Sequence, residues 1–341
     1  MDLAETRSPR PITVGGATVA FGPLVVPSYS SKALARTSVE RTIANTVEYV
    51  AGAVLISAYD IAYNQVSPNV FGAQLIIVDS GGYETLVDDA GRARGGNADH
   101  ASFPWSPEVY RQTLDAIDVK CPVIAVSYDR TGLEIGDQMD ATVAARNPAL
   151  GSAFLIKPKA GRRLTIEAVA ESAPALAHFD VVGVTEKEAG ETFADRLKFI
   201  ARLRALMDAN GVEKPIHVFG GLDPFMTPLY FLAGADIVDG LTWLRMAFTE
   251  TGARYLPAYA AMIEPTARLE DAEWRIRRAN FRRAVDIQNA MRRFLRSGDY
   301  AELAADRVVR EAMIRAHGEI LRNSPSVASD DAQAGSTRGR G

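Results

Sequence analysis

Two aspartates end apolar, strand-like runs in this chain, a position suited to nucleophilic or acid-base chemistry. Asp239 follows the run 235–238 and precedes Arg245 by six residues, and Asp79 follows the run 74–78. Glycosidic chemistry uses such a pair, because one carboxylate attacks or stabilises the sugar carbon while the other moves protons. An aspartate after a strand also serves as a turn residue or a helix N-cap. The fold around each acid decides between these interpretations.

Short runs rich in Val and Ile alternate with segments of helical periodicity, which is typical of a parallel sheet buried on both faces. The eight expected strands are 24–27, 53–57, 74–78, 123–127, 153–156, 180–184, 216–219 and 235–238. The expected helices are 38–50, 107–118, 137–146, 165–175, 189–209 and 224–233. Only the connection between the second and third strands is too short for a full helix. This order predicts an α/β fold, a (β/α)8 TIM barrel with a C-terminal helical extension, and a doubly wound open sheet is the alternative.

In a (β/α)8 barrel the active site forms where the strands end. The residues expected on this rim are Tyr59, Asp60, Asp79, Ser80, Tyr128, Asp129, Lys157, Thr185, Glu186, Gly220, Gly221 and Asp239. N-caps explain several of the acids but not Lys157 or Glu186 on the same rim. Glycines 81, 82, 220 and 221 allow close approach of a flat ligand, or simply form turns. Tyr83, Tyr128 or Phe219 can stack on a base, or pack in the core.

Composition excludes several classes of protein. The chain has 341 residues, is 47% hydrophobic and 23% charged, and carries a net charge of −4, so contact with nucleic acid needs a local basic patch. Cys121 is the only cysteine, which excludes an intramolecular disulfide and a multi-thiolate zinc site and indicates a cytoplasmic protein. No stretch approaches the roughly 18 apolar residues of a membrane span. Four scattered histidines, with His178 and His217 read as core residues, predict no metal and no cofactor.

Several motifs resemble those of the tRNA-guanine transglycosylase family, barrel enzymes that replace guanine in a nucleic acid by a 7-deazaguanine such as queuine. The stretch 79–83, Asp-Ser-Gly-Gly-Tyr, resembles the family's Asp-Ser-Gly-Gly-Phe/Tyr motif, and 236–239 with Arg245 is similar to its Asp-Met-Phe-Asp segment and following Arg. The resemblance covers about 12–307. It implies that Asp239 is the nucleophile, Asp79 the general acid/base and Asp129 the reader of the guanine edge.

The rim and the resemblance together assign a set of residues to substrate binding. These are Ser80, Gly81, Tyr83, Asp129, Lys157, Glu186, Gly220, Gly221 and Arg245. Three features depart from the family's pattern. The zinc site of three cysteines and a histidine is missing, Lys157 and Pro158 replace a glutamine pair, and the glycine-rich strand before Glu186 contains only Gly183.

The chemistry also follows from the residue types alone. Breaking a purine N-glycosidic bond builds positive charge on the sugar, which Asp239 can stabilise or trap as a covalent glycosyl intermediate. The departing purine needs a proton and the incoming one must lose a proton, so Asp79 can serve both half-reactions. The donor edge of guanine suits bidentate acceptance by Asp129, which alternatively caps the Asp-Arg-Thr-Gly turn.

A helix rich in arginine is expected near the C-terminus. Between 274 and 297 there are eight arginines and one acid, Asp286. The apolar stripe of this helix consists of Phe281, Ala284, Ile287, Met291, Phe294 and Leu295. Its arginines, and in particular Arg277, Arg278, Arg282 and Arg283, are expected to bind nucleic-acid phosphates, or else to form a solvated face.

These observations predict three regions: a transglycosylase barrel over 1–262, Arg-rich helices packed on it over 263–323, and a disordered tail over 324–341. The polar segment 92–104 is expected to be a rim loop or lid. The expected function is guanine exchange in a nucleic acid, with DNA slightly preferred because the zinc module associated with tRNA enzymes is missing. A zinc-less tRNA enzyme and a catalytically silent nucleic-acid-binding subunit are the alternatives, and a homodimer or partner protein is left open.

Overall fold

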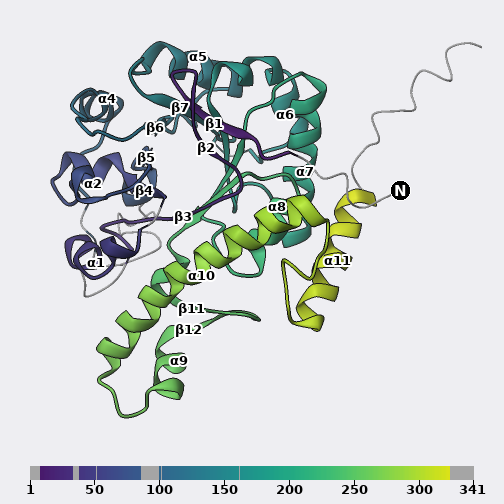
Figure 1. Cartoon of the computed structure of the whole chain (residues 1–341). Coiled ribbons are helices and arrows are strands. Elements are labelled where there is room, and N and C mark those ends of the chain that lie inside the picture. Colours follow the sequence, from purple (N-terminus) through teal and green to yellow (C-terminus); the bar gives the residue numbers. More distant parts are fainter. Residues whose placement is uncertain are drawn as a thin grey trace, which may run out of the picture.

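The computed structural model describes residues 8–33, 38–50, 52–85, 100, 102–160 and 162–322 (Figure 1). Eight parallel strands form one sheet in the order β3-β10-β9-β8-β7-β6-β5-β4. They are β3 (Leu24–Pro27), β4 (Ala53–Ser57), β5 (Leu75–Asp79), β6 (Val123–Val126), β7 (Gly151–Ile156), β8 (Val181–Thr185), β9 (Ile216–Phe219) and β10 (Ile237–Gly240). A parallel bridge between Ser28 and Leu55 joins the two outermost strands. The chain is therefore a (β/α)8 barrel, as predicted.

All eight predicted strands are present, with ends that shift by no more than two residues. Continuous apolar runs predict them well, because a parallel strand in this fold is covered on both faces. The shifts matter at two positions. Asp79 is the last residue of β5, and Asp239 is the last but one of β10, so both acids belong to the strands rather than to the loops that follow.

Helices cover the outside of the barrel. They are α1 (Val39–Thr46), α2 (Ala58–Ala62), α3 (Gly82–Thr85), α4 (Pro107–Asp115), α5 (Ile135–Ala145), α6 (Ile166–Ala170), α7 (Phe193–Ala209) and α8 (Met226–Leu232), with 3-10 turns η1 (Val47–Tyr49), η2 (Pro68–Val70), η3 (Ala173–His178) and η4 (Thr242–Leu244). Helix α7 begins at Phe193 rather than at 189, because Thr192 and Asp195 form a capping box there. The short connection between the second and third strands holds the five-residue helix α2.

The barrel interior is a packed apolar core. Its buried members include Val26, Leu55, Ile77 and Ile237. A hairpin of β1 (Pro11–Val14) and β2 (Ala17–Phe21) adds Ile12 to this cluster next to residues that begin their strands, such as Leu75. The hairpin therefore closes the N-terminal end of the barrel and leaves the C-terminal end for a site.

Beyond the barrel, the chain forms an arm and two long helices. They consist of the hairpin β11 (Met246–Thr249) and β12 (Gly252–Tyr255), then α9 (Leu256–Ile263), α10 (Leu269–Ser297) and α11 (Arg307–Arg322). Asn280 joins α10 to η4 and to the hairpin, because its Nδ2 donates to the carbonyls of Trp243 and Met246 at 2.7 and 2.8 Å. The predicted apolar stripe of α10 is buried except for Phe294, which is half-buried.

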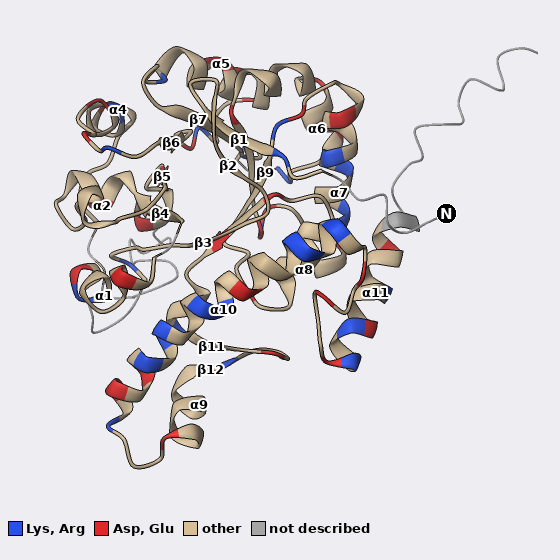
Figure 2. Ribbon diagram, viewed as in Figure 1, with Lys and Arg blue, Asp and Glu red and all other residues tan. Residues whose placement is uncertain are grey.

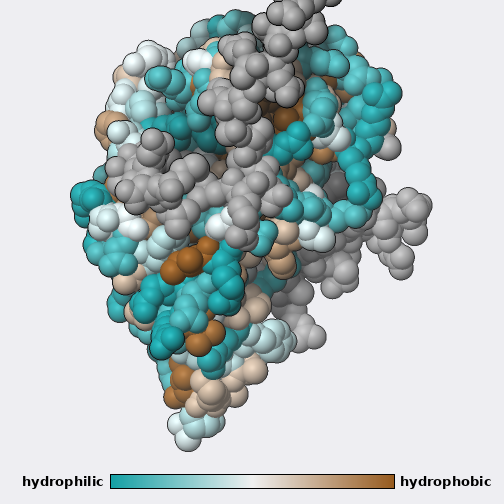
Figure 3. All heavy atoms as spheres, turned by 90° about the vertical axis from the view of Figure 1, so that its right-hand side faces the viewer, coloured by the Kyte–Doolittle hydropathy of each residue, from teal (hydrophilic) through white to brown (hydrophobic). Residues whose placement is uncertain are grey.

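Helix α9 crosses the boundary predicted at 262, and the predicted tail 324–341 lies outside the described residues. Helix α9 and the start of α10 project from the barrel at the bottom of Figure 1. Apolar side chains are exposed at this tip, with Met262 60% and Leu269 50% exposed, and Figure 3 shows brown residues there.

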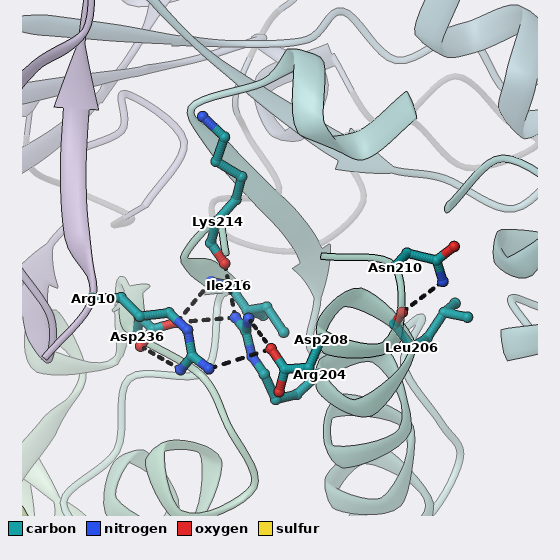
Figure 4. Close-up of polar contacts among 8 residues, drawn as sticks. All are labelled: Arg10, Arg204, Leu206, Asp208, Asn210, Lys214, Ile216 and Asp236. Atoms are coloured by element: carbon teal, nitrogen blue, oxygen red, sulfur yellow. Dashed lines mark hydrogen bonds and ion pairs between the residues drawn. The ribbon is translucent and has the colours of Figure 1, made fainter. Parts of the chain in front are cut away.

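A buried charged network lies at the N-terminal end of the barrel, opposite the rim (Figure 4). The carboxylate of Asp236 accepts hydrogen bonds from Arg204 Nη2 at 3.2 Å and from the backbone N–H of Ile216 at 3.0 Å. Arg204 also donates to the carbonyl of Lys214, and Arg10 lies 3.6 Å from Asp236. The network ties α7 and the N-terminal segment to β9 and β10.

Replacing Asp236 by Asn should destabilise the fold by about 3–5 kcal/mol, because Arg204 would keep its charge in a buried position after losing its buried carboxylate partner, with only the exposed Asp208 left to pair with it. Urea denaturation measures this difference. Glu167→Gln, which breaks the exposed pair with Arg202, is the control and should cost less than about 1 kcal/mol. Equal effects of the two substitutions would contradict a structural role for the buried network.

Candidate active site

The C-terminal ends of the strands bring the predicted acids together at one rim. Asp79 ends β5 and Asp239 lies at the end of β10, while Asp129 and Lys157 follow β6 and β7. Parallel strands in a closed barrel all end on the same side, so these side chains share one end of the molecule. The charges of Asp129 and Asp239 raise the pKa of Asp79 and the charge of Lys157 lowers it, which is consistent with side chains that lie close together.

Asp239 is a carboxylate surrounded by hydrogen-bond donors. Its Oδ2 accepts from Ser28 Oγ at 2.6 Å, and its Oδ1 accepts from the backbone N–H of Gly220 at 3.1 Å. His217 Nε2 lies 3.1 Å from the same Oδ1. The residue is only 4% exposed. Because a carboxylate oxygen accepts hydrogen bonds, these contacts hold both oxygens of Asp239 in place at the end of β10.

Asp79 has the opposite environment. Burial raises its pKa to about 7, and the negative charges of Glu84, Asp129 and Asp239 add to the effect, while Lys157 opposes it. No described residue donates a hydrogen bond to its side chain. A carboxyl group that titrates near pH 7 can both donate and accept a proton under physiological conditions, as a general acid/base must.

The turn after Asp79 is built from Ser80 and Gly81. Ser80 is buried, and its carbonyl accepts a hydrogen bond from Trp105 Nε1 at 2.9 Å. Gly81 has a φ of 87°, and a Cβ there would lie 2.8 Å from the same Trp105 nitrogen. Glycine is therefore required at position 81 by the packing of Trp105.

Asp129, Lys157 and Glu188 form a charged group on the rim. Lys157 Nζ lies 3.3 Å from Asp129 Oδ2 and 3.2 Å from Glu188 Oε2. Burial raises the pKa of Asp129, and Lys157 partly offsets this. Burial by itself lowers the pKa of Lys157, but the two carboxylates raise it overall. Asp129 Oδ1 is buried and has no hydrogen-bond partner among the described residues.

The acid that completes this group is Glu188 and not Glu186, which the sequence predicted as a substrate-binding residue of the rim. Glu186 Oε1 accepts hydrogen bonds from Arg196 Nη1 at 2.7 Å and from the Tyr230 hydroxyl at 2.8 Å, which tie it to α7 and α8. Glu188 instead accepts hydrogen bonds from the Thr185 hydroxyl and from Lys157 Nζ. Glu186 therefore does not join the Asp129–Lys157 pair, whereas Glu188, which the sequence analysis missed, does.

Lys32, Asp60 and Glu84 form a second group of buried charged residues, next to Tyr83. Burial raises the pKa of Glu84 to about 7 and that of Asp60 to about 6, and the charge of Asp60 also raises the pKa of Glu84. Lys32 is buried, and its Nζ donates to the carbonyl of Tyr83 at 2.8 Å. Glu84 and Lys32 escaped the sequence analysis, since neither directly follows an apolar run.

Arg245 and the glycine pair complete the list of predicted binding residues. Arg245 is exposed, and its Nη2 donates to the carbonyl of Ala33 at 2.9 Å and contacts the Tyr83 hydroxyl at 3.4 Å. Gly220 gives its N–H to Asp239, as described above. Gly221 is buried against Tyr230 and is used in packing.

Figure 2 shows positively charged residues in blue along α10, and the four predicted phosphate-binding arginines among them differ in burial and in pairing. Arg277 was predicted to bind phosphate, but it is 8% exposed. Its Nε donates to the carbonyl of Leu244 at 3.0 Å and its Nη2 pairs with Glu273 at 3.1 Å, so the prediction for this residue is wrong. Arg278, Arg282 and Arg283 form no ion pair within the described part of the chain. Arg282 is exposed, and the other two are half-buried.

Within the described ranges, no three His, Cys, Asp or Glu side chains gather so that they can hold a metal ion, and the expectation of a metal-free protein stays a prediction. None of the described helices has the length and apolarity to cross a bilayer. Most of the predicted loop 92–104 lies outside the described residues.

Comparison of the sequence with protein-family models found no match, and comparison with curated proteins found none either.

Asp79→Asn should stabilise the folded protein near pH 7 and change it little near pH 4. An unfolded aspartate ionises near pH 4, whereas the folded protein holds this proton up to about pH 7. The stability contributed by protonated Asp79 is therefore lost as the pH rises through that window, and Asn, which stays neutral, avoids the loss. Urea denaturation of both proteins at several pH values measures the difference.

The matched control for this experiment is Asp140→Asn, which replaces an exposed carboxylate on α5. Its effect on stability should not grow between pH 4 and pH 7. A constant difference between wild type and Asp79→Asn over the same range would show that Asp79 is ionised throughout and unsuited to acid/base work.

Proposed function

We propose that this protein is a base-exchange transglycosylase that replaces guanine in a nucleic acid by a 7-deazaguanine, through a glycosyl intermediate on Asp239. The observation that carries the proposal is the contrast between two carboxylates on one rim. Donors surround Asp239, while Asp79 is half-buried among other acids and its pKa is raised to about 7. Two acids in opposite environments are what a nucleophile and a proton carrier require.

The first half-reaction follows from these two groups. Asp239 forms a bond to the anomeric carbon of the sugar, and the bond from that carbon to the guanine nitrogen breaks with its electron pair going to the base. Protonated Asp79 then supplies the proton that the leaving base needs. In the second half-reaction the incoming base loses its proton to Asp79 and displaces Asp239 from the sugar. No cofactor is needed, because the reaction consumes no electrons and the bond energy is conserved.

Asp129 is assigned to recognition of the guanine edge. Lys157 pairs with its Oδ2, while its Oδ1 has no partner among the described residues and can accept a donor from the base. Guanine offers adjacent imino and amino donors, which match an acceptor group of this kind. Glu188 shares Lys157 with Asp129 and so contributes to holding the lysine in place.

The nucleic acid is proposed to contact α10 through Arg278, Arg282 and Arg283, because guanidinium groups without carboxylate partners bind phosphates well.

DNA is preferred over tRNA only because the chain lacks the zinc module of the tRNA enzymes it resembles. A cytoplasmic location goes with either substrate. A silent binding subunit has no need for the donors around Asp239, which favours the enzyme.

Wild-type protein incubated with labelled guanine should transfer label into one nucleic-acid pool, duplex DNA in the preferred version, and tRNA in the alternative. Asp239→Asn keeps the shape of the side chain but removes the charge, so exchange should fall by orders of magnitude while nucleic-acid binding persists. Asp79→Asn should also lose exchange, because no proton reaches the leaving base. Binding of nucleic acid without label in either pool would support the silent subunit instead.

Replacing Arg278, Arg282 and Arg283 by Gln should weaken binding to duplex DNA and flatten its salt dependence. Each phosphate contact contributes a slope of about 0.9 in a plot of log affinity against log salt concentration, through released counterions. Fluorescence anisotropy at several salt concentrations measures it.

Two arginines of the same helix serve as controls for this experiment. Arg275→Gln, in an exposed pair with Glu264, should change the slope little. Arg277→Gln should lower the stability of the fold rather than change the slope, because Arg277 is buried. An unchanged slope in the triple variant would remove α10 from the binding surface.

A further inference from the structure

The interior of the barrel contains a histidine that the proposed chemistry has not yet used. His217 on β9 has no exposed surface, and its Nε2 lies 3.1 Å from Asp239 Oδ1. Its neighbours Ile216 and Val218 belong to the core between sheet and helices, whereas Phe219 belongs to the interior core. Because side chains alternate along a strand, His217 points into the barrel, beneath the rim.

The hydrogen-bond partner of His217 determines which ring nitrogen carries a hydrogen. An ionised Asp239 can only accept, so Nε2 must carry a hydrogen. Nδ1 is buried and has no hydrogen-bond partner among the described residues. A second hydrogen at Nδ1 would be a buried donor without an acceptor, which is costly, so the neutral tautomer with hydrogen on Nε2 fits the site.

The imidazole ring is also held in one orientation. The ring of Phe219 stacks on it with a centroid distance of 3.7 Å and an interplanar angle of 29°. Gly183 on the adjacent strand β8 makes room for this stack, since a Cβ there would lie 2.6 Å from the Phe219 ring. The packing therefore directs the N–H of His217 toward Asp239 and leaves it little freedom to turn away.

The two oxygens of Asp239 consequently differ. Oδ1 receives two N–H groups held by β9 and the turn after it, from His217 and Gly220, whereas Oδ2 receives only the hydroxyl of Ser28 among the residues that the structure describes. A hydroxyl can rotate to another acceptor, but a backbone N–H and a packed imidazole cannot. Oδ2 is thus the oxygen that can be released for reaction.

We propose that His217 is a positioning residue that holds Oδ1 and leaves Oδ2 as the attacking atom, an inference that rests on the proposed transglycosylase function. Oδ2 forms the bond to the anomeric carbon as the bond to guanine breaks, and Oδ1 becomes the carbonyl oxygen of the ester. When the incoming base displaces the sugar, the electrons of the ester bond return to the carboxylate. His217 and Gly220 then stabilise the charge that reappears on Oδ1.

The test measures two rates in a single turnover. One is the rate at which the denaturation-resistant adduct between protein and nucleic acid forms, and the other is the rate at which it is resolved. His217→Leu should slow resolution of the adduct about 10- to 100-fold, the range for losing a hydrogen bond to a charged group. It should also slow formation, because Oδ2 is no longer held in the attacking position, and it should leave the affinity for nucleic acid unchanged. His217→Gln places an amide N–H near Nε2 and should recover most of the rate. His317→Gln, a buried histidine on α11 far along the chain from the site, should react like wild type.

A merely structural histidine predicts a different pattern. His217→Leu would then react within twofold of wild type once corrected for its folded fraction, or Gln and Leu would be equally slow, and either result would overturn the inference. A wild type that forms no adduct would overturn the proposed function together with the role of Oδ2, so the two failures are distinguishable.

Nitrogen-15 NMR of the imidazoles gives a readout that does not depend on activity. The His217 signal, identified by its loss in His217→Gln, should show a protonated Nε2 and a bare Nδ1, and Asp239→Asn should shift the Nε2 proton. Protonation at Nδ1 in the wild type, or no response to Asp239→Asn, would refute the proposed hydrogen bond.

Discussion

The hydrogen bonds to Asp239 depend on closure of the barrel. Its donors come from both strands that flank β10, since Ser28 follows β3 while His217 and Gly220 lie on or after β9. Ser28 also bridges to Leu55 of β4, where the sheet closes on itself. A barrel opened at this seam would displace the Ser28 hydroxyl from Oδ2. The environment of the proposed nucleophile is therefore a product of the whole fold.

Three other acids of this end of the barrel have raised pKa values. Glu84 and Asp60 are buried and Asp79 is half-buried, in a region with few compensating cations, and this loss of solvent raises the pKa of each. Burial of acids in this way costs stability, and proteins retain such arrangements mainly where chemistry needs a shifted pKa. The apolar interior of the barrel supplies stability that the rim does not.

The fold and the main acids could be predicted from the sequence because both follow from apolar runs. A strand buried on both faces must be continuously apolar, and the first polar residue after it marks the rim. Arg277 could also have been placed correctly, since it lies four residues before Phe281 and so shares the buried face of α10.

His217 and Glu188 could not be identified in this way. A single histidine in the run 216–219 looks like a core residue until the register of β9 against β10 shows that it faces Asp239. Glu186 and Glu188 are two residues apart, and only the turn held by Thr185 decides which of them meets Lys157. Both cases depend on contacts between residues on or after neighbouring strands, and the order of apolar and polar residues along the sequence does not reveal these contacts.

The most direct test of the account is to locate the covalent bond. The wild-type protein, trapped by denaturation during turnover with its nucleic-acid substrate and digested by protease and nuclease, should yield one peptide carrying a sugar fragment, with the added mass on Asp239. Attachment to any other residue, or measurable base exchange without a bond to the protein, would contradict the assignment of Asp239 as the nucleophile.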